Sequence, residues 1–237
     1  MTIEEKIKNL ERSQKEIDEK IREIDENSFL DGIIDIEKYV NSSIKIMWVL
    51  KEPYSDEKSC NWREYIEDIN DGTGNLGGFA KTFTKIIYTT YGILNGKKWS
   101  EIEWIRDNPK ITEVIGQIAY INIKKTPGGS VSNDTELTEN YAVFRDIVME
   151  QIKLYKPNVI IGGNTIKFLG NDLKVIYPDL KYSKYIESSD LGISSSAIDN
   201  LIVFDACHPC IRKNQEIYCN DMIINFMQIS QLKENNS

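Results

Sequence analysis

The sequence predicts a three-layer α/β/α fold with a central four-stranded parallel sheet, and three observations lead to it. Four short apolar runs, each rich in β-branched or aromatic residues and stopped by Gly, Pro or Asn, are typical of strands buried on both faces: 44–50, 117–123, 158–161 and 201–206. Helical stretches separate the runs, and this alternation favours a parallel sheet. The carboxyl ends of parallel strands meet at one edge, where open α/β sheets bind ligands.

The N-terminal segment predicts one long charged helix. Its large aliphatic residues and one glutamine recur at spacings of four and three, as in the seam of a coiled coil: Ile3, Ile7, Leu10, Gln14, Ile17, Ile21 and Ile24. Two arrangements stay open, namely a homodimer zipper or hairpin with a partner, and a helix laid back across its own domain. We therefore divide the chain into a helical extension with its linker, 1–40, and an α/β domain, 41–237.

The remaining elements follow the strands in order. An irregular polar segment, 54–78, is longer than a bare connector, and such loops are usually functional or mobile. A second mixed loop, 177–200, precedes the last strand. Asn164 is the expected N-cap of the helix that follows the third strand. The helices that the sequence predicts are 79–94, 99–107, 141–155, 165–176 and 216–232.

Composition limits the possible partners. The 237 residues include 37 acidic and 29 basic side chains, for a net charge of −8, so no global positive field attracts nucleic acid or an anionic membrane. A nucleic-acid site must be a local basic patch with salt-sensitive affinity. The sequence begins without the pattern of a signal peptide, and no apolar run reaches membrane-spanning length. We expect a cytoplasmic protein with reduced cysteines and no membrane partner.

Polar groups follow each of the four runs. The first is followed by Lys51-Glu52-Pro53-Tyr54, and the second ends at Asn122 before the turn 124–129. The third leads into Gly162-Gly163-Asn164, and the last into Cys207-His208-Pro209-Cys210. One edge of the sheet is therefore expected to hold a carboxylate, an amide and the only histidine in the chain.

The order of these motifs resembles the uracil-DNA glycosylase superfamily over residues 44–230. In one branch the first motif is Gly-Gln-Asp-Pro-Tyr, and here Glu52 stands in the place of its catalytic aspartate, before Pro53-Tyr54. The stretch Tyr120-Ile121-Asn122-Ile123-Lys124-Lys125-Thr126-Pro127 is similar to the strand of the thermostable bacterial branch whose asparagine reads uracil. Residues 154–163 resemble that branch's next strand entry, and Cys207-His208-Pro209-Cys210 corresponds to the family's His-Pro-Ser motif.

The resemblance implies a DNA glycosylase that excises uracil, or a related deaminated or damaged base, by hydrolysis of the N-glycosidic bond. Glu52 would stabilise the sugar cation and orient a water, and His208 would donate to the leaving base. Asn122 would read the edge of the base, and Tyr54 would wall the pocket. An aromatic side chain must stack on the base, and both Trp62 and Phe79 are candidates.

The resemblance also implies contacts with single- or double-stranded DNA from the same edge. Lys124, Lys125 and the backbone amides of Gly128 and Gly129 would bind phosphate. Past the histidine, Ile211 would wedge into the base stack while Arg212 binds the DNA backbone. The chain also departs from the family, since Leu50 stands where the family has a glycine that lets the backbone approach the substrate.

No cofactor or metal is expected. The thermostable branch uses four cysteines for an iron–sulfur cluster, but Cys60, Cys207, Cys210 and Cys219 occupy other positions. Two alternatives stay open. One is a glycosylase-fold protein that binds nucleic acid or a nucleotide without excising a base. The other is a thiol or metal site at Cys207-x-x-Cys210, a spacing that zinc and redox sites share.

Overall fold

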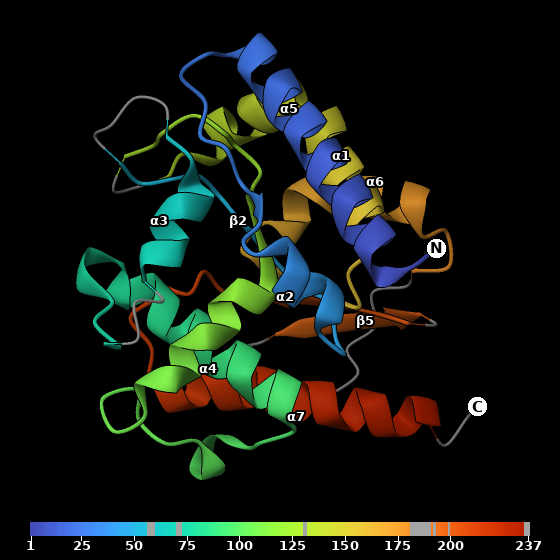
Figure 1. The fold of residues 1–237 in the computed structure, drawn as a ribbon. Coiled ribbons are helices and arrows are strands. Elements are labelled where there is room, and N and C mark those ends of the chain that lie inside the picture. The colour runs from blue at the N-terminus through green and yellow to red at the C-terminus, as the bar shows by residue number, and fades with distance from the viewer. Residues whose placement is uncertain are drawn as a thin grey trace.

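A computed structural model describes residues 1–55, 60–69, 73–129, 132–180, 191, 193–198 and 200–234. It confirms an α/β fold with a long N-terminal helix (Figure 1). The described strands form one sheet in the order β1-β3-β2-β4-β6-β5. Its six strands are β1 (Gly32–Ile33), β2 (Ile46–Leu50), β3 (Ile118–Asn122), β4 (Val159–Gly163), β5 (Ser194–Ile198) and β6 (Leu201–Ala206).

The four predicted runs correspond to β2, β3, β4 and β6, and each pairs in parallel with its neighbour. The expected sheet of four strands is nevertheless a mixed sheet of six, because β1 and β5 add antiparallel pairs at its two edges. The sequence does not reveal these edge strands. β1 has two residues, and β5 reads Ser-Ser-Ser-Ala-Ile, which lacks the apolar run of a buried strand.

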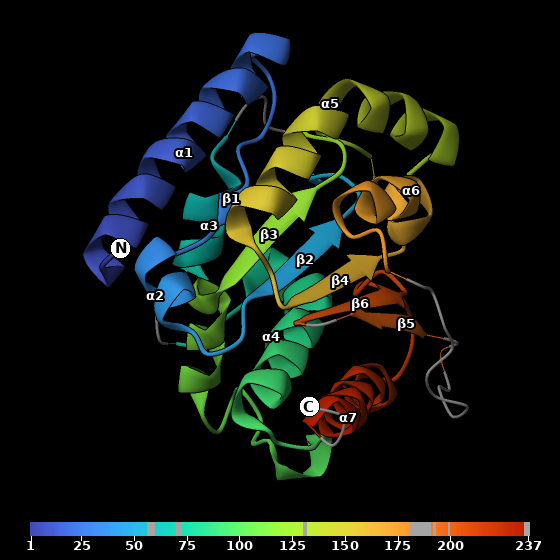
Figure 2. The same ribbon diagram turned by 90° about the vertical axis from the view of Figure 1, so that its right-hand side faces the viewer.

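Helices cover both faces of the sheet (Figure 2). The predictions over 79–94, 141–155, 165–176 and 216–232 are confirmed with shifted ends, whereas 99–107 forms only one short 3-10 turn. The α-helices are α1 (Ile3–Ile24), α2 (Ile36–Asn41), α3 (Trp62–Asp68), α4 (Ala80–Asn95), α5 (Asp134–Tyr155), α6 (Ile166–Ile176) and α7 (Gln215–Glu234). The 3-10 helices are η1 (Gly77–Phe79), η2 (Trp99–Glu101) and η3 (Pro109–Gln117).

Two predictions, one of an irregular segment and one of a helix N-cap, need correction. The segment expected to be irregular contains α3, whose N-cap Asn61 accepts a hydrogen bond from the backbone of Arg63. The cap of α6 is Thr165 rather than Asn164, because Asn164 adopts a left-handed backbone with φ of 60°. Asparagine tolerates that conformation better than most residues, so it forms the turn instead of the cap.

Two apolar cores lie on opposite faces of the sheet. On one face, alternate strand residues such as Trp48, Tyr120 and Phe204 pack against α3, α4 and α7. On the other face, Met47, Ile121 and their neighbours pack against α2, α5 and α6. Every residue of β2, β3 and β4 is buried as a result, which explains why these strands read as continuous apolar runs.

The N-terminal helix α1 lies alongside α5 in both views (Figures 1 and 2). Ile17 and Ile21 of α1 form a small core with Phe144 and Ile147 of α5. The seam is therefore buried against its own domain along its middle, while Ile3 at one end is 56% exposed. The homodimer remains a prediction that this packing does not support.

Gln14, which reads as a polar break in the seam, completes the edge of the sheet. Its Oε1 accepts from the backbone N–H of Ile33 at 2.9 Å, and its Nε2 donates to the Ile33 carbonyl at 3.2 Å. The side-chain amide thus takes the place of a further strand beside β1. Such capping removes the exposed backbone groups that make edge strands prone to aggregation. Across the described ranges, no helix has the length and apolar character needed to cross a membrane.

Candidate active site

The parallel strands β3, β2, β4 and β6 point the same way in the sheet (Figure 2). The predicted site residues lie at or just after the carboxyl ends of three of them. Asn122 ends β3, Glu52 lies two residues after β2, and His208 lies two residues after β6. Leu50 is the register partner of Asn122, and Gly163 is the register partner of Ala206. All of these turns therefore share one edge of the sheet.

Asn122 has a buried side chain without a partner. The residue is 1% exposed, and neither Oδ1 nor Nδ2 of its amide forms a hydrogen bond. Tyr120, two residues earlier on the strand, packs in the core on the α3 and α4 face, so the Asn122 side chain faces the same way. A buried polar group without a partner costs about 1 to 3 kcal/mol, so this amide is suited to a ligand with both a donor and an acceptor.

A buried polar network fixes the backbone of Asn122. Its N–H donates to Oδ2 of Asp31 at 2.7 Å. The Asp31 carboxylate also accepts from Lys125 Nζ at 2.7 Å and from Gln151 Nε2 at 2.9 Å. These three residues are at most 1% exposed, so the end of β3 is held by a desolvated ion pair.

His208 is held in one neutral tautomer. The backbone N–H of Cys210 donates to its Nδ1 at 3.2 Å, and the Cys210 Sγ lies 3.0 Å from the same nitrogen. Since Nδ1 accepts, the hydrogen-bond pattern assigns the ring proton to Nε2. Burial, and to a smaller extent the charges of Lys51 and Lys85, lowers the pKa of His208 to about 4. At neutral pH the ring is therefore an uncharged N–H donor.

Lys85 of α4 fixes the turn that follows His208. Its Nζ donates to the Ile211 carbonyl at 2.6 Å and lies 5.0 Å from the centre of the Tyr218 ring. The Tyr218 hydroxyl donates in turn to the Cys207 carbonyl at 2.7 Å. Both ends of the histidine turn are thus anchored to helices on the same face of the sheet.

Glu52 is tethered to the turn that follows β3. Its Oε2 accepts from Lys124 Nζ at 2.8 Å, and Lys124 also pairs with Glu136 at the start of α5. Burial lowers the pKa of Lys124, but the hydrogen bonds and charges of Glu136 and Glu52 outweigh it, so the pKa is raised. Glu52 and Lys124 side chains are only 6% and 4% exposed.

The absence of a side chain at Gly128 leaves the space that the Glu52 carboxylate occupies. The Gly128 N–H donates to the Pro53 carbonyl at 2.9 Å. Tyr54 and Gly128 form an isolated parallel β-bridge. A Cβ at Gly128 would overlap the carboxylate of Glu52, whereas nothing lies within 4 Å of a Cβ at Gly129. The first glycine is therefore required by close contact and the second is not.

The burial of Lys125 and Lys124 does not support the predicted contacts of their side chains with DNA phosphate. Lys125 is fully buried against Asp31, and burial lowers its pKa despite that partner. Lys124 is 3% exposed and neutralises two carboxylates. A basic residue next to a strand end reads as solvated in sequence, but partners from segments distant in the sequence bury both ammonium groups.

The residues predicted to wall the pocket and to stack on the base differ in how exposed they are. Trp62 is 6% exposed and packs in the core against Phe29 and Tyr120, which does not support the prediction that it stacks on a base. Tyr54 is 68% exposed and does not enclose a pocket here. The Phe79 backbone ends η1, and its side chain lies outside the described part of the structure, so its stacking role stays a prediction.

The exposed members of the predicted DNA surface are Gly129 and Arg212. Ile211 is half-buried and packs against the core, which does not support its role as a wedge. Sequence reasoning missed Asp31, Gln151 and Lys85. These residues act through contacts with distant segments, and no local pattern marks them.

The cysteines are free thiols. Cys219 is buried, and burial raises its pKa to about 12, which disfavours a thiolate. Within the described ranges, no three His, Cys, Asp or Glu side chains form a group that could hold a metal ion. Neither observation favours a thiol or metal site at Cys207-x-x-Cys210.

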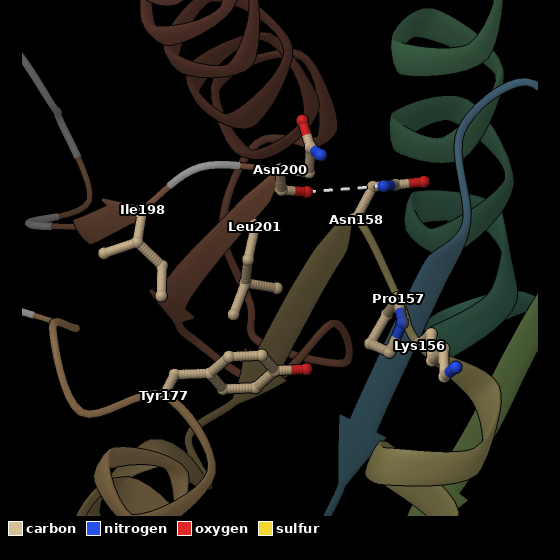
Figure 3. Close-up of a pocket in the computed structure, with 7 residues that line it drawn as sticks. All are labelled: Lys156, Pro157, Asn158, Tyr177, Ile198, Asn200 and Leu201. Carbon is tan, nitrogen blue, oxygen red and sulfur yellow. Dashed lines mark hydrogen bonds between the residues drawn. The ribbon is translucent and has the colours of Figure 1, made fainter.

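A separate hollow of about 340 Å³ lies at the opposite edge, at the amino ends of β4 and β6 (Figure 3). Asn158 there donates to the Asn200 carbonyl at 3.3 Å and accepts from the Lys45 N–H at 2.8 Å. Its side chain ties the beginnings of three strands together, which is a structural role. The buried amide of Asn122, which has no protein partner, lies instead at the carboxyl end of β3.

Comparison of the chain with protein-family models and with curated proteins gives no match.

Proposed function

We propose that this protein is a DNA glycosylase that removes uracil, or a related deaminated or damaged base, by hydrolysis of the N-glycosidic bond. One observation carries the proposal: the edge that bears the unpartnered amide of Asn122 also bears the neutral Nε2–H of His208. A pyrimidine edge offers the alternating donors and acceptors that such groups recognise. The similarity of the strand-end motifs to the uracil-DNA glycosylase superfamily supports the same reaction.

In the proposed reaction the bond between the sugar C1′ and the base nitrogen breaks, with positive charge growing on the sugar and negative charge on the base. His208 donates from Nε2 to the pyrimidine oxygen on which the negative charge gathers. An uncharged donor suits this task because the ring stabilises the anion without giving up its proton. The Asn122 amide binds the edge of the same base. A water oxygen then bonds to C1′, and a water proton balances the charge of the released base.

Glu52 acts on the sugar side. The described hydrogen bond of its carboxylate uses Oε2, which Lys124 holds. Oε1 is the oxygen left to orient the attacking water. The carboxylate also stabilises the growing positive charge, because Coulomb attraction is strong in a site with little water.

The target nucleotide must be extruded from a duplex, or be single-stranded, before the site can reach it. Arg212 and the backbone amide of Gly129 are exposed and suit phosphate. Lys51 adds a positive charge that acts on His208. These few groups work against a net charge of −8, so binding should weaken steeply with salt.

A second candidate function is binding of a nucleobase or nucleotide without excision. The observation that favours it is the pairing of Glu52 with Lys124, which offsets the negative charge that the reaction would need. This candidate uses the same Asn122 and His208 groups. Only an assay of bond cleavage separates the two functions.

The test is incubation with fluorescent oligonucleotides that each carry one uracil, hypoxanthine, xanthine or hydroxymethyluracil, followed by alkaline cleavage of abasic sites. His208→Ala, purified identically, controls for a contaminating enzyme. Scission by the parent protein alone supports the glycosylase. Selective binding of one oligonucleotide without scission supports the second candidate. Neither scission nor selective binding contradicts both.

A further inference from the structure

Both polar atoms of the buried Asn122 amide lack a protein partner, which is rare for a buried side chain. Leu50 is its register partner on the neighbouring strand β2. Leu50 packs in the same core as Tyr120, on the α3 and α4 face, so Leu50 and Asn122 are neighbours on that face. The neighbour of the amide on β2 is thus an aliphatic side chain that cannot hydrogen-bond.

On its other side, Leu50 reaches over β4. A Cβ placed on Gly163 would overlap Cδ2 of Leu50, and it would lie 3.2 Å from Cδ of Pro209 and 3.5 Å from Cα of His208. The leucine side chain therefore fills the space that the missing Gly163 side chain leaves, directly beside the histidine turn. Leu50 is 1% exposed, so it is enclosed there.

A row thus crosses the sheet from Asn122 of β3 through Leu50 of β2 and Gly163 of β4. It ends at His208, two residues after β6. A pyrimidine that contacts both the Asn122 amide and the His208 ring must span this row. In the present structure its place above β2 and β4 is occupied by Leu50. The groups that would recognise the base are therefore in place, but the Leu50 side chain lies between them.

We propose that Leu50 is a gate, which closes the base-binding site at rest and must leave Gly163 when a pyrimidine enters. The inference rests on the proposed function, and it names the residue that limits access to that site. A site that is open for only a fraction of the time binds with its affinity reduced by that fraction. Shortening Leu50 should therefore raise the affinity for the base without adding any contact.

The experiment measures fluorescence anisotropy of a short single-stranded oligonucleotide with one central uracil, and of the same oligonucleotide with thymine. Glu52→Gln is present in every protein so that the oligonucleotide stays intact. Leu50→Ala is compared with the parent, and Leu50→Val shortens the side chain by one methylene in case alanine weakens the fold. Leu173→Ala is the matched control, because Leu173 is fully buried on the opposite face of the sheet.

Leu50→Ala should bind the uracil oligonucleotide about tenfold more tightly, as expected for a site open roughly a tenth of the time, with Leu50→Val between it and the parent. Leu173→Ala should bind like the parent. If the parent prefers uracil to thymine and both Leu50 variants bind no more tightly, the gate is wrong while the proposed function stands. If no variant prefers uracil, the proposed function fails and the gate fails with it.

Discussion

The backbone N–H of Cys210 donates to Nδ1 of His208 across 3.2 Å, and this bond decides the form in which the only histidine acts. It assigns the ring proton to Nε2 in the neutral imidazole. The low pKa, caused first by burial and then by Lys51 and Lys85, keeps the ring in that form over the whole neutral range. The site therefore presents a fixed donor rather than a titrating acid.

The first prediction is a titration. Nitrogen chemical shifts of the single histidine should report the Nε2–H tautomer at pH 7 and a pKa of about 4. Because the folded pKa lies below the unfolded value, the unfolded state binds the proton first as the pH falls. The contribution of the neutral His208 ring to the free energy of unfolding should be fully present above about pH 6.5 and should decline toward pH 4. A titration midpoint at or above 6.5 would contradict the buried, neutral ring.

His208→Gln is the control for that pH dependence. Glutamine does not titrate, so unfolding by urea should lose the part of the slope between pH 6.5 and 4 that the histidine causes. Carboxylates contribute equally to the slope of both proteins, so the difference between the two slopes isolates the histidine. An identical slope for the parent and the variant would show that His208 does not titrate with folding.

The second prediction concerns the buried pair of Lys125 and Asp31. Lys125→Ala leaves the Asp31 charge desolvated and should lower the free energy of unfolding by about 3 to 5 kcal/mol. Lys20→Ala removes the exposed pair with Glu150 and should cost at most about 1 kcal/mol. Urea denaturation measures both values. A stable Lys125→Ala protein that had merely lost DNA affinity would restore the phosphate contact predicted from the sequence.

The third prediction uses two adjacent glycines. Gly128→Ala should displace the Glu52 carboxylate and reduce turnover, because the added methyl group overlaps it. Gly129→Ala adds the same methyl group where nothing lies within 4 Å, so its turnover should match that of the parent. Single-turnover excision rates give the comparison. Equal rates for the two variants would remove Glu52 from the proposed site.

The fourth prediction tests the capped edge of the sheet. Gln14→Ala leaves the buried N–H and carbonyl of Ile33 without partners, and each lost partner costs about 1 to 3 kcal/mol. Hydrogen exchange at the Ile33 amide should accelerate by the corresponding factor. Light scattering should show that parent and variant have the same mass. A parent dimer that dissociates on this substitution would instead place Gln14 in an interface between two chains.

The sequence predicts the central part of the fold because β2, β3, β4 and β6 are buried on both faces and each ends at, or within three residues of, a Gly, Pro or Asn. The two edge strands escape prediction because their pairing, and not their composition, makes them strands. At the site, the sequence indicates which groups lie at strand ends. It does not indicate that Asp31, from the segment before the first long strand, buries Lys125. Burial of a charge depends on a distant partner, which no local pattern carries.

The most direct measurement of the central claim is single-turnover release of uracil from a single-stranded oligonucleotide at saturating protein. The parent protein should excise uracil. His208→Ala should be slower by a factor of about 100 to 1,000, the usual effect of one lost preorganised donor. The excision rate of Glu52→Gln should fall as well, while its affinity for the oligonucleotide stays nearly unchanged. Excision by both variants at the parent rate would contradict the claim that Glu52 and His208 carry the reaction.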